Sequence, residues 1–151
     1  MSITASGVFG LTLAKQLDDT LAKGMGSDTN VYTLLVSDAF TPDFDAMDFR
    51  DDVTNEIANG DGYTTGGALT TSTSLVTSTD GTVIYDATDR AWVTSTITDA
   101  MAAVGYWSGG TASSADELFW LSDFVTAASS ANGTFTVQWS TGGILIYDFT
   151  P

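Results

Sequence analysis

The sequence has no cysteine, no histidine and only four basic residues, against 19 acidic ones. Without cysteine and histidine, the chain cannot build a zinc finger, a thiolate nucleophile or a Ser-His-Asp triad. The four cations are too few to neutralise a row of phosphates, so we expect no binding to nucleic acid. A net charge of −15 would be repelled by an anionic membrane surface. No apolar run approaches the roughly 18 residues that a membrane span needs, so no membrane partner is expected either.

What the chain does contain points to one folded domain rich in β-structure. Its 151 residues suit a single domain, and 43% of them are hydrophobic, which is enough for a core without disulfides. Hydroxyl side chains are abundant, with 25 threonines and 15 serines. Threonine is β-branched and tolerates a solvent-facing sheet position, so this excess predicts sheets with a wet outer face.

Residues 30–151 read as a β-domain punctuated by turns. Asp80-Gly81 and Asn132-Gly133 are hairpin signals, and Gly142-Gly143 predicts a turn before the last strand. Residues 100–104 also allow a helix. The sequence predicts an antiparallel β-sandwich or jelly-roll-like domain with one N-terminal α-helix. The expected strands span residues 30–37, 68–79, 82–87, 92–94, 97–107, 118–124, 134–139 and 144–149.

The one clear helical pattern lies within residues 1–29. Apolar residues recur every fourth position from Val8 to Lys23, at Phe9, Leu13, Leu17 and Leu21. Ser6 is the expected N-cap, and Gly24 and Gly26 are the expected terminators. This helix either packs on its own domain or acts as an arm that binds a partner through Phe9, Leu13 and Leu17.

Residues 38–52 predict a long ordered loop that is both acidic and aromatic. Five of the ten residues from Asp43 to Asp52 are aspartates. Phe40, Phe44 and Phe49 lie between the acids, and we expect these rings to pin the loop to the body. The same rings, with Tyr106 and Trp107, either close the ends of the core or anchor a protein partner.

No pattern in the sequence predicts catalysis, a cofactor or a metal. Asp43, Asp45 and Asp48 could offer oxygen ligands to calcium, but their spacing does not fit an EF-hand, and a solvated acidic loop is the preferred interpretation. A glycosidase needs two carboxyl groups facing each other across a cleft. Glu56 and Glu117 are the only glutamates, and nothing in the sequence brings them together.

Four segments resemble a family of small structural proteins of tailed bacteriophages. They are SITASGVFGLTLAKQL, TPDFDAMDFRDDVTNEI, GDGYTTGGALT and VIYDATDRAWVTSTIT, in this order along the chain. The positions that carry the resemblance are Ser6-Gly7, Thr41 to Asp45, Phe49 to Glu56, Gly62 to Gly67 and Tyr85 to Thr98. The chain departs from the pattern at Asp89-Arg90-Ala91 and at Ala100 to Val104.

The resemblance implies a non-enzymatic virion protein, most simply a capsid decoration or cement protein. Cement proteins are small β-rich domains that clamp neighbouring subunits of the major capsid protein, often as trimers. A charge of −15 disfavours a surface facing packaged DNA, which agrees with the capsid exterior. A tail or head–tail junction protein is the first alternative. A carbohydrate-binding or hydrolytic β-sandwich is the second.

Overall fold

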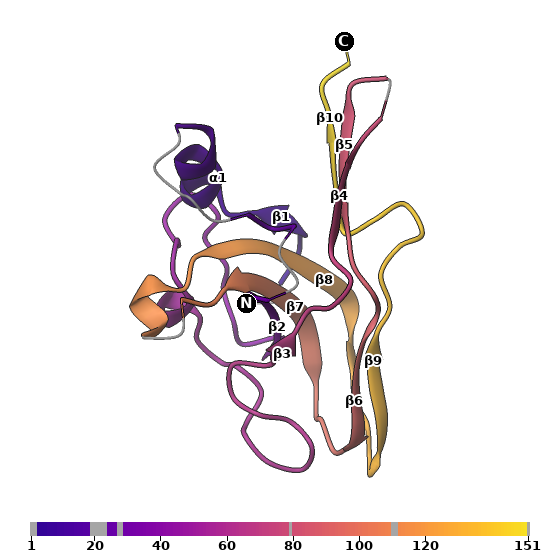
Figure 1. Ribbon diagram of the computed structural model, residues 1–151. Coiled ribbons are helices and arrows are strands. Elements are labelled where there is room, and N and C mark those ends of the chain that lie inside the picture. Colours follow the sequence, from indigo (N-terminus) through magenta and orange to yellow (C-terminus); the bar gives the residue numbers. More distant parts are fainter. Residues whose placement is uncertain (1–2, 19–23, 27–28, 79, 110–111, 151) are drawn as a thin grey trace.

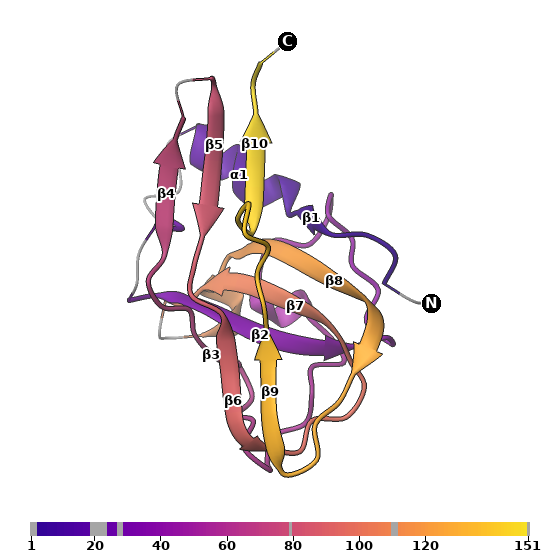
Figure 2. The same cartoon turned by 90° about the vertical axis from the view of Figure 1, so that its right-hand side faces the viewer.

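The second half of the chain folds back on itself as one long, bent antiparallel ribbon (Figures 1 and 2). This computed structural model describes residues 3–18, 24–26, 29–78, 80–109 and 112–150. The strands are β1 (Gly7–Val8), β2 (Val31–Ser37), β3 (Ala68–Leu69), β4 (Ser74–Thr77), β5 (Thr82–Asp86), β6 (Arg90–Ser95), β7 (Ala100–Trp107), β8 (Leu118–Ala128), β9 (Gly133–Val137) and β10 (Leu145–Asp148). The helical elements are α1 (Gly10–Leu17) and two 3₁₀ turns, η1 (Arg50–Asp52) and η2 (Ser113–Ala115).

The ribbon pairs β5, β6 and β7 on the way out with β10, β9 and β8 on the way back. It turns a corner between β6 and β7, where Ile97 and Ser130 exchange backbone hydrogen bonds of 3.1 and 2.8 Å. The three pairs of strands therefore belong to three different sheets. They are nevertheless continuous along the chain, because β5, β6 and β7 follow one another on the way out and β8, β9 and β10 follow one another on the way back.

The central sheet has the strand order β1-β8-β7-β2-β3, with antiparallel neighbours. Its middle strands are buried on both faces, and alternate residues of β2 enter different cores: Val31 and Leu35 on one face, Leu34 and Val36 on the other. The β6–β9 pair covers the first face through Trp92. The N-terminal segment and the loop after β2 cover the second face. The fold is thus mainly β, antiparallel and β-sandwich-like, with one N-terminal helix, which confirms the predicted fold class.

A three-stranded sheet, β10-β5-β4, projects beyond this body and ends near the C-terminus (Figures 1 and 2). We call it the finger. The predicted turn at Asp80-Gly81 is confirmed: β4 and β5 are paired antiparallel, and Gly81 has a φ of 81°, which glycine adopts readily. Of the two alternatives for residues 100–104, the strand is correct and the helix is not formed, since β7 occupies this range.

The predicted helix is shorter than its sequence pattern. It begins at Gly10 and ends at Leu17, with Phe9 rather than Ser6 as its N-cap and Asp18 as its C-cap. Leu21 and Lys23 lie outside the described residues. The backbone N–H of Phe9 donates to Phe119 O at 3.1 Å, so the residues before the helix join the sheet as β1. The boundary expected at residue 29 does not separate the packing, because Ile3 and Phe9 are part of the core.

The predicted hairpin at Asn132-Gly133 is wrong. Asn132 has the expected left-handed backbone, with a φ of 49°. However, β8 pairs with β7, and β9 pairs with β6. The Asn-Gly pair therefore forms one side of the corner in the ribbon and does not join two paired strands.

Close to this corner, Val125 occupies a strained backbone conformation. Its φ is 65°, and β-branched residues rarely adopt the left-handed region. It lies where the β7–β8 register shifts, with its N–H donating to Asp123 Oδ1 at 2.8 Å. Its side chain is 80% exposed, so burial contributes little at this position.

Val125→Asn is therefore expected to raise the free energy of unfolding by about 1 kcal/mol, because asparagine tolerates this conformation better. Urea unfolding followed by tryptophan fluorescence measures the change. Val93→Asn is the matched control, since Val93 is 68% exposed in β6 and does not itself have a positive φ. It should lose a few tenths of a kcal/mol through lower β-propensity. Equal effects of the two substitutions would contradict the prediction.

Candidate interaction surface

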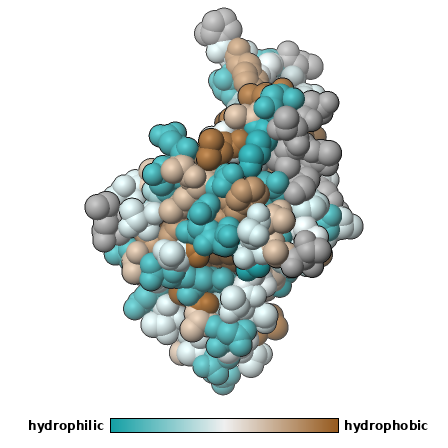
Figure 3. Space-filling model, turned by 90° about the vertical axis from the view of Figure 1, so that its left-hand side faces the viewer, coloured by the Kyte–Doolittle hydropathy of each residue, from teal (hydrophilic) through white to brown (hydrophobic). Residues whose placement is uncertain are grey.

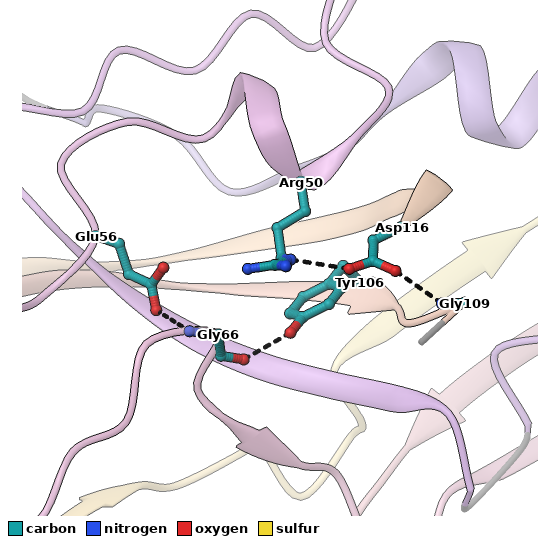
Figure 4. Close-up of polar contacts among 6 residues, drawn as sticks. All are labelled: Arg50, Glu56, Gly66, Tyr106, Gly109 and Asp116. Atoms are coloured by element: carbon teal, nitrogen blue, oxygen red, sulfur yellow. Dashed lines mark hydrogen bonds and ion pairs between the residues drawn. The ribbon is translucent and has the colours of Figure 1, made fainter. Parts of the chain in front are cut away.

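A polar network fastens the acidic loop to the central sheet (Figure 4). Arg50 Nε donates to Asp116 Oδ2 at 2.9 Å, and Gly109 N donates to Asp116 Oδ1 at 2.7 Å. The Arg50 guanidinium lies 5.3 Å from the centre of the Tyr106 ring. Burial lowers the pKa of Arg50, but the hydrogen bond to Asp116 and the electrostatic effects of Tyr106, Asp116 and Glu56 together outweigh burial and raise it. The ion pair therefore joins η1 to the loop before β8.

The network continues on the other side of Arg50 through Gly66. The Tyr106 hydroxyl donates to Gly66 O at 2.7 Å, and Gly66 N donates to Glu56 Oε1 at 2.6 Å. The Tyr63 hydroxyl also donates to Glu56 Oε1, at 2.8 Å, and accepts from Leu35 N at 3.0 Å. Burial raises the pKa of both tyrosines, so both hydroxyls stay protonated as donors. Each of these contacts joins two groups of this chain, so the network has a structural role.

The acidic loop uses several of its carboxylates as local caps. Asp43 Oδ1 accepts from the N–H groups of residues 45 and 46, and Asp52 Oδ2 accepts from those of residues 48 and 49. Lys15 Nζ pairs with Asp48 Oδ2 at 2.8 Å. Among the described residues, no group of three His, Cys, Asp or Glu side chains is placed to hold a metal ion. The expected attachment of the loop to the body is confirmed. It is made by these polar contacts and by the packing of Phe40 and Phe44 against the core.

Three of the predicted partner-binding residues are buried within the domain. Phe9 and Phe40 have no exposed surface, and Tyr106 is nearly as buried. All three belong to the core on the loop side of the central sheet. For these rings, the interpretation that they close the core is correct, and they offer no surface to a partner in this fold.

Phe44, Phe49 and Trp107 are half-buried. Phe44 packs on Phe9, with ring centres 5.3 Å apart. The ammonium of Lys15 lies 4.4 Å from the centre of the Phe49 ring, and Trp107 packs against the core on the other side of the sheet. These rings serve mainly to hold the loop and the sheet ends together.

Leu13 and Leu17 differ from the other predicted residues, because α1 turns them toward surface that the described residues leave open. Leu17 is 80% exposed, and Leu13 lines an apolar hollow of about 170 Å³ between α1 and the finger. We call this hollow the helix–finger groove. In Figure 3, which shows the α1 side, several brown residues lie in the upper part, where the finger rises. The groove is lined by Leu13, Gln16, Met25, Leu75, Val83, Tyr147 and Phe149.

The finger residues of this surface were missed from the sequence. The strands that carry them were predicted, but the contact between β5 and β10 joins segments far apart in the chain. The side chains of Leu75 and Phe149 are largely exposed, whereas this chain buries most of its aromatic residues. The available signal for this surface was strand alternation, which places Leu75 and Thr77 of β4 on the same face as Leu145 and Tyr147 of β10.

Two further hollows, of about 270 and 290 Å³, do not have Glu56 or Glu117 in their lining. One lies along residues 57–61 with Thr96 and Thr98, and the other lies between β8 and β9 on the inside of the corner. No helix of the described residues is long and apolar enough to cross a membrane. Comparisons with protein-family models, with curated proteins and with solved structures find no match to this chain. The case for a function therefore rests on the surface of the protein itself.

Proposed function

We propose that the protein is a non-enzymatic structural protein of a tailed-phage virion. It binds the outer surface of the assembled major capsid shell as a decoration or cement protein. The observation that carries the proposal is the finger, a sheet that leaves the body and exposes apolar side chains beside α1. Self-association, as a trimer in the form that the resemblance implies, belongs to the same proposal.

The finger and α1 present apolar surface that the domain does not need for its own core. Leu17, Leu75 and Phe149 are each more than half exposed on or beside the helix–finger groove. Small soluble domains rarely expose large apolar side chains side by side unless a partner covers them. A projecting sheet with an apolar groove at its base suits a protein that inserts between neighbouring subunits.

The charge of the chain supports an exterior position. The net charge of −15 would repel packaged DNA, whereas a capsid surface with basic groups would attract it. The ionisable groups described above are used for internal contacts, as in the Arg50 network. A cement protein stabilises a shell only by binding the assembled form more tightly than the free subunit.

Purified protein mixed with capsids of its own phage, prepared without it, is expected to co-sediment in hundreds of copies per particle. It should also raise the temperature at which the shell breaks, and it should not bind unassembled capsid protein. Leu17→Ser tests the exposed apolar surface beside the helix–finger groove, with Val93→Ser as the matched control on an exposed valine of β6. The first variant should bind several-fold more weakly, and the control should bind like the wild type.

The copy number separates the proposal from its nearest alternative. A head–tail junction ring holds about a dozen copies, because it follows the rotational symmetry of the portal axis. About a dozen copies, located by electron microscopy at the tail vertex, would favour a junction protein. Absence from both shell and tail would refute a structural role in the virion.

A further inference from the structure

The face of the finger that points away from α1 carries a row of three aliphatic side chains. The register places Val76 of β4 directly opposite Ile84 of β5, and Ile84 directly opposite Ile146 of β10. Directly opposed residues of antiparallel strands lie on the same face, with neighbouring side chains in contact range. Figure 2 looks onto this face of the finger, with α1 behind it. We call these three residues the aliphatic row.

The two outer side chains of the aliphatic row are exposed to solvent, and Ile84 between them is half-buried. Val76 is 55% exposed and Ile146 is 58% exposed, although both belong to paired strands. The loop before β10 lies against the row, and it carries glycine where it does so. A Cβ at Gly142 would lie 3.6 Å from Ile146 Cδ1, and one at Gly143 would collide with Ile84 Cγ2 at 2.6 Å.

Carboxylates flank the row on both sides. The next pair along the sheet on one side is Ser74 with Asp86, and on the other side Thr82 faces Asp148. Asp148 is exposed at the rim, and its Oδ1 accepts from Thr150 N at 2.9 Å. The surface is therefore an apolar strip between two negative ends.

A second copy of this chain is a poor occupant for such a strip. Two copies related by a two-fold axis would bring the aspartates of one strip near those of the other, at a net charge of −15 per chain. The described cations are already engaged: Lys15 with Asp48, Arg50 with Asp116, and Arg90 with Leu69 O. None of them lies on the finger.

We propose that the aliphatic row is the docking strip for an apolar segment flanked by lysine or arginine on the assembled shell. This inference rests on the proposed function and names the chemistry of the partner. The aliphatic side chains supply the area removed from water, and Asp86 and Asp148 orient the partner through its cations. Binding through the strip should weaken as salt is added, because the rim charges are exposed.

The test measures binding to capsids of the wild type and of Val76→Thr/Ile146→Thr. Threonine keeps the β-branched shape at both positions, so the finger should remain folded, which circular dichroism and thermal unfolding check. The double variant is expected to bind about tenfold more weakly. Val93→Thr is the matched control, because it makes the same change at an exposed valine outside the finger, and it should bind like the wild type.

Asp148→Asn tests the charged rim separately. Asparagine keeps an Oδ1 acceptor for Thr150 N, so the local turn should persist. The variant is expected to bind about threefold more weakly at low salt, with a smaller loss of binding between low and high salt than the wild type shows. A salt dependence equal to that of the wild type would contradict the proposal that the partner carries lysine or arginine.

Failure of this inference differs from failure of the proposed function. If the wild type binds capsids and the double variant binds equally well, the docking strip is refuted, and the decoration role remains. If sedimentation shows a wild-type dimer that the double variant loses, the occupant is a second copy and the cationic partner is refuted.

If the wild type does not bind capsids, the proposed function fails, and a synthetic peptide tests the strip on its own. The peptide has three valines between paired lysines, and its binding to the full chain is followed by NMR. Shifts confined to Val76, Ile84, Ile146 and their neighbours would support the strip, and their absence would overturn it.

Discussion

Gly105→Ala is expected to destabilise the protein by about 3 kcal/mol or more, the upper range for overpacking a core. Gly105 of β7 lies opposite Trp120 of β8, and both are buried. A Cβ at Gly105 would lie only 2.0 Å from Trp120 Cε2. The ring has little room to retreat, because Trp139 meets it edge-on with 5.2 Å between ring centres.

The measurement is urea unfolding of the variant beside Gly133→Ala. Gly133 begins β9, and the nearest atom to a Cβ there is 3.8 Å away. Neither glycine has a left-handed backbone, so the two substitutions differ in available space and not in conformational strain. The control should change stability by less than about 0.5 kcal/mol. A Gly105→Ala protein as stable as the control would show that the β7–β8 pair can separate to admit a methyl group.

The second large effect is expected for Arg50→Met, which should cost about 2 to 3 kcal/mol in the free energy of unfolding. The substitution removes the hydrogen bond and the charge that Arg50 offers to the buried carboxylate of Asp116. The hydrogen bond from Gly109 N to this carboxylate is kept. Methionine preserves most of the side-chain volume, so the loss reports the missing charge. The cost lies below that of a fully buried pair, because the Arg50 side chain retains some exposure.

Lys15→Met is the matched control for this prediction. The Lys15–Asp48 pair has nearly the same length, 2.8 Å against 2.9 Å, but both of its side chains are more exposed than Asp116. Its removal should cost no more than about 1 kcal/mol. Thermal unfolding of both variants in the same buffer gives the comparison. Equal losses would mean that burial of Asp116 does not set the strength of the Arg50 contact.

Most strands could be predicted from patterns of a few residues. The alternation of Phe135 and Val137 with Thr136 indicated β9, and both apolar residues are buried while the threonine is exposed. Asp80-Gly81 indicated the turn between β4 and β5. Such signals depend on neighbours along the chain, because strand alternation and a left-handed glycine are local properties.

Where a local pattern competed with packing, the prediction was wrong. The four-residue spacing begins at Phe9, but the core takes this ring and its N–H pairs with β8, so the helix begins one residue later. Asn132 adopts the backbone of a turn, but the strands around it pair elsewhere. A single sequence carries little information about which distant strand will be the partner.

The sequence by itself determined an acidic β-protein with a pinned aromatic loop and no means for histidine or cysteine chemistry. These conclusions depend on composition and local periodicity, which do not change with the fold. Only the tertiary structure decided that Val76, Ile84 and Ile146 form one row between two aspartates. The physical reason is that the row is complete only when β10, from a distant part of the chain, pairs with the β4–β5 hairpin in one register. That long-range register is set by the packing of the whole ribbon and not by neighbours along the chain.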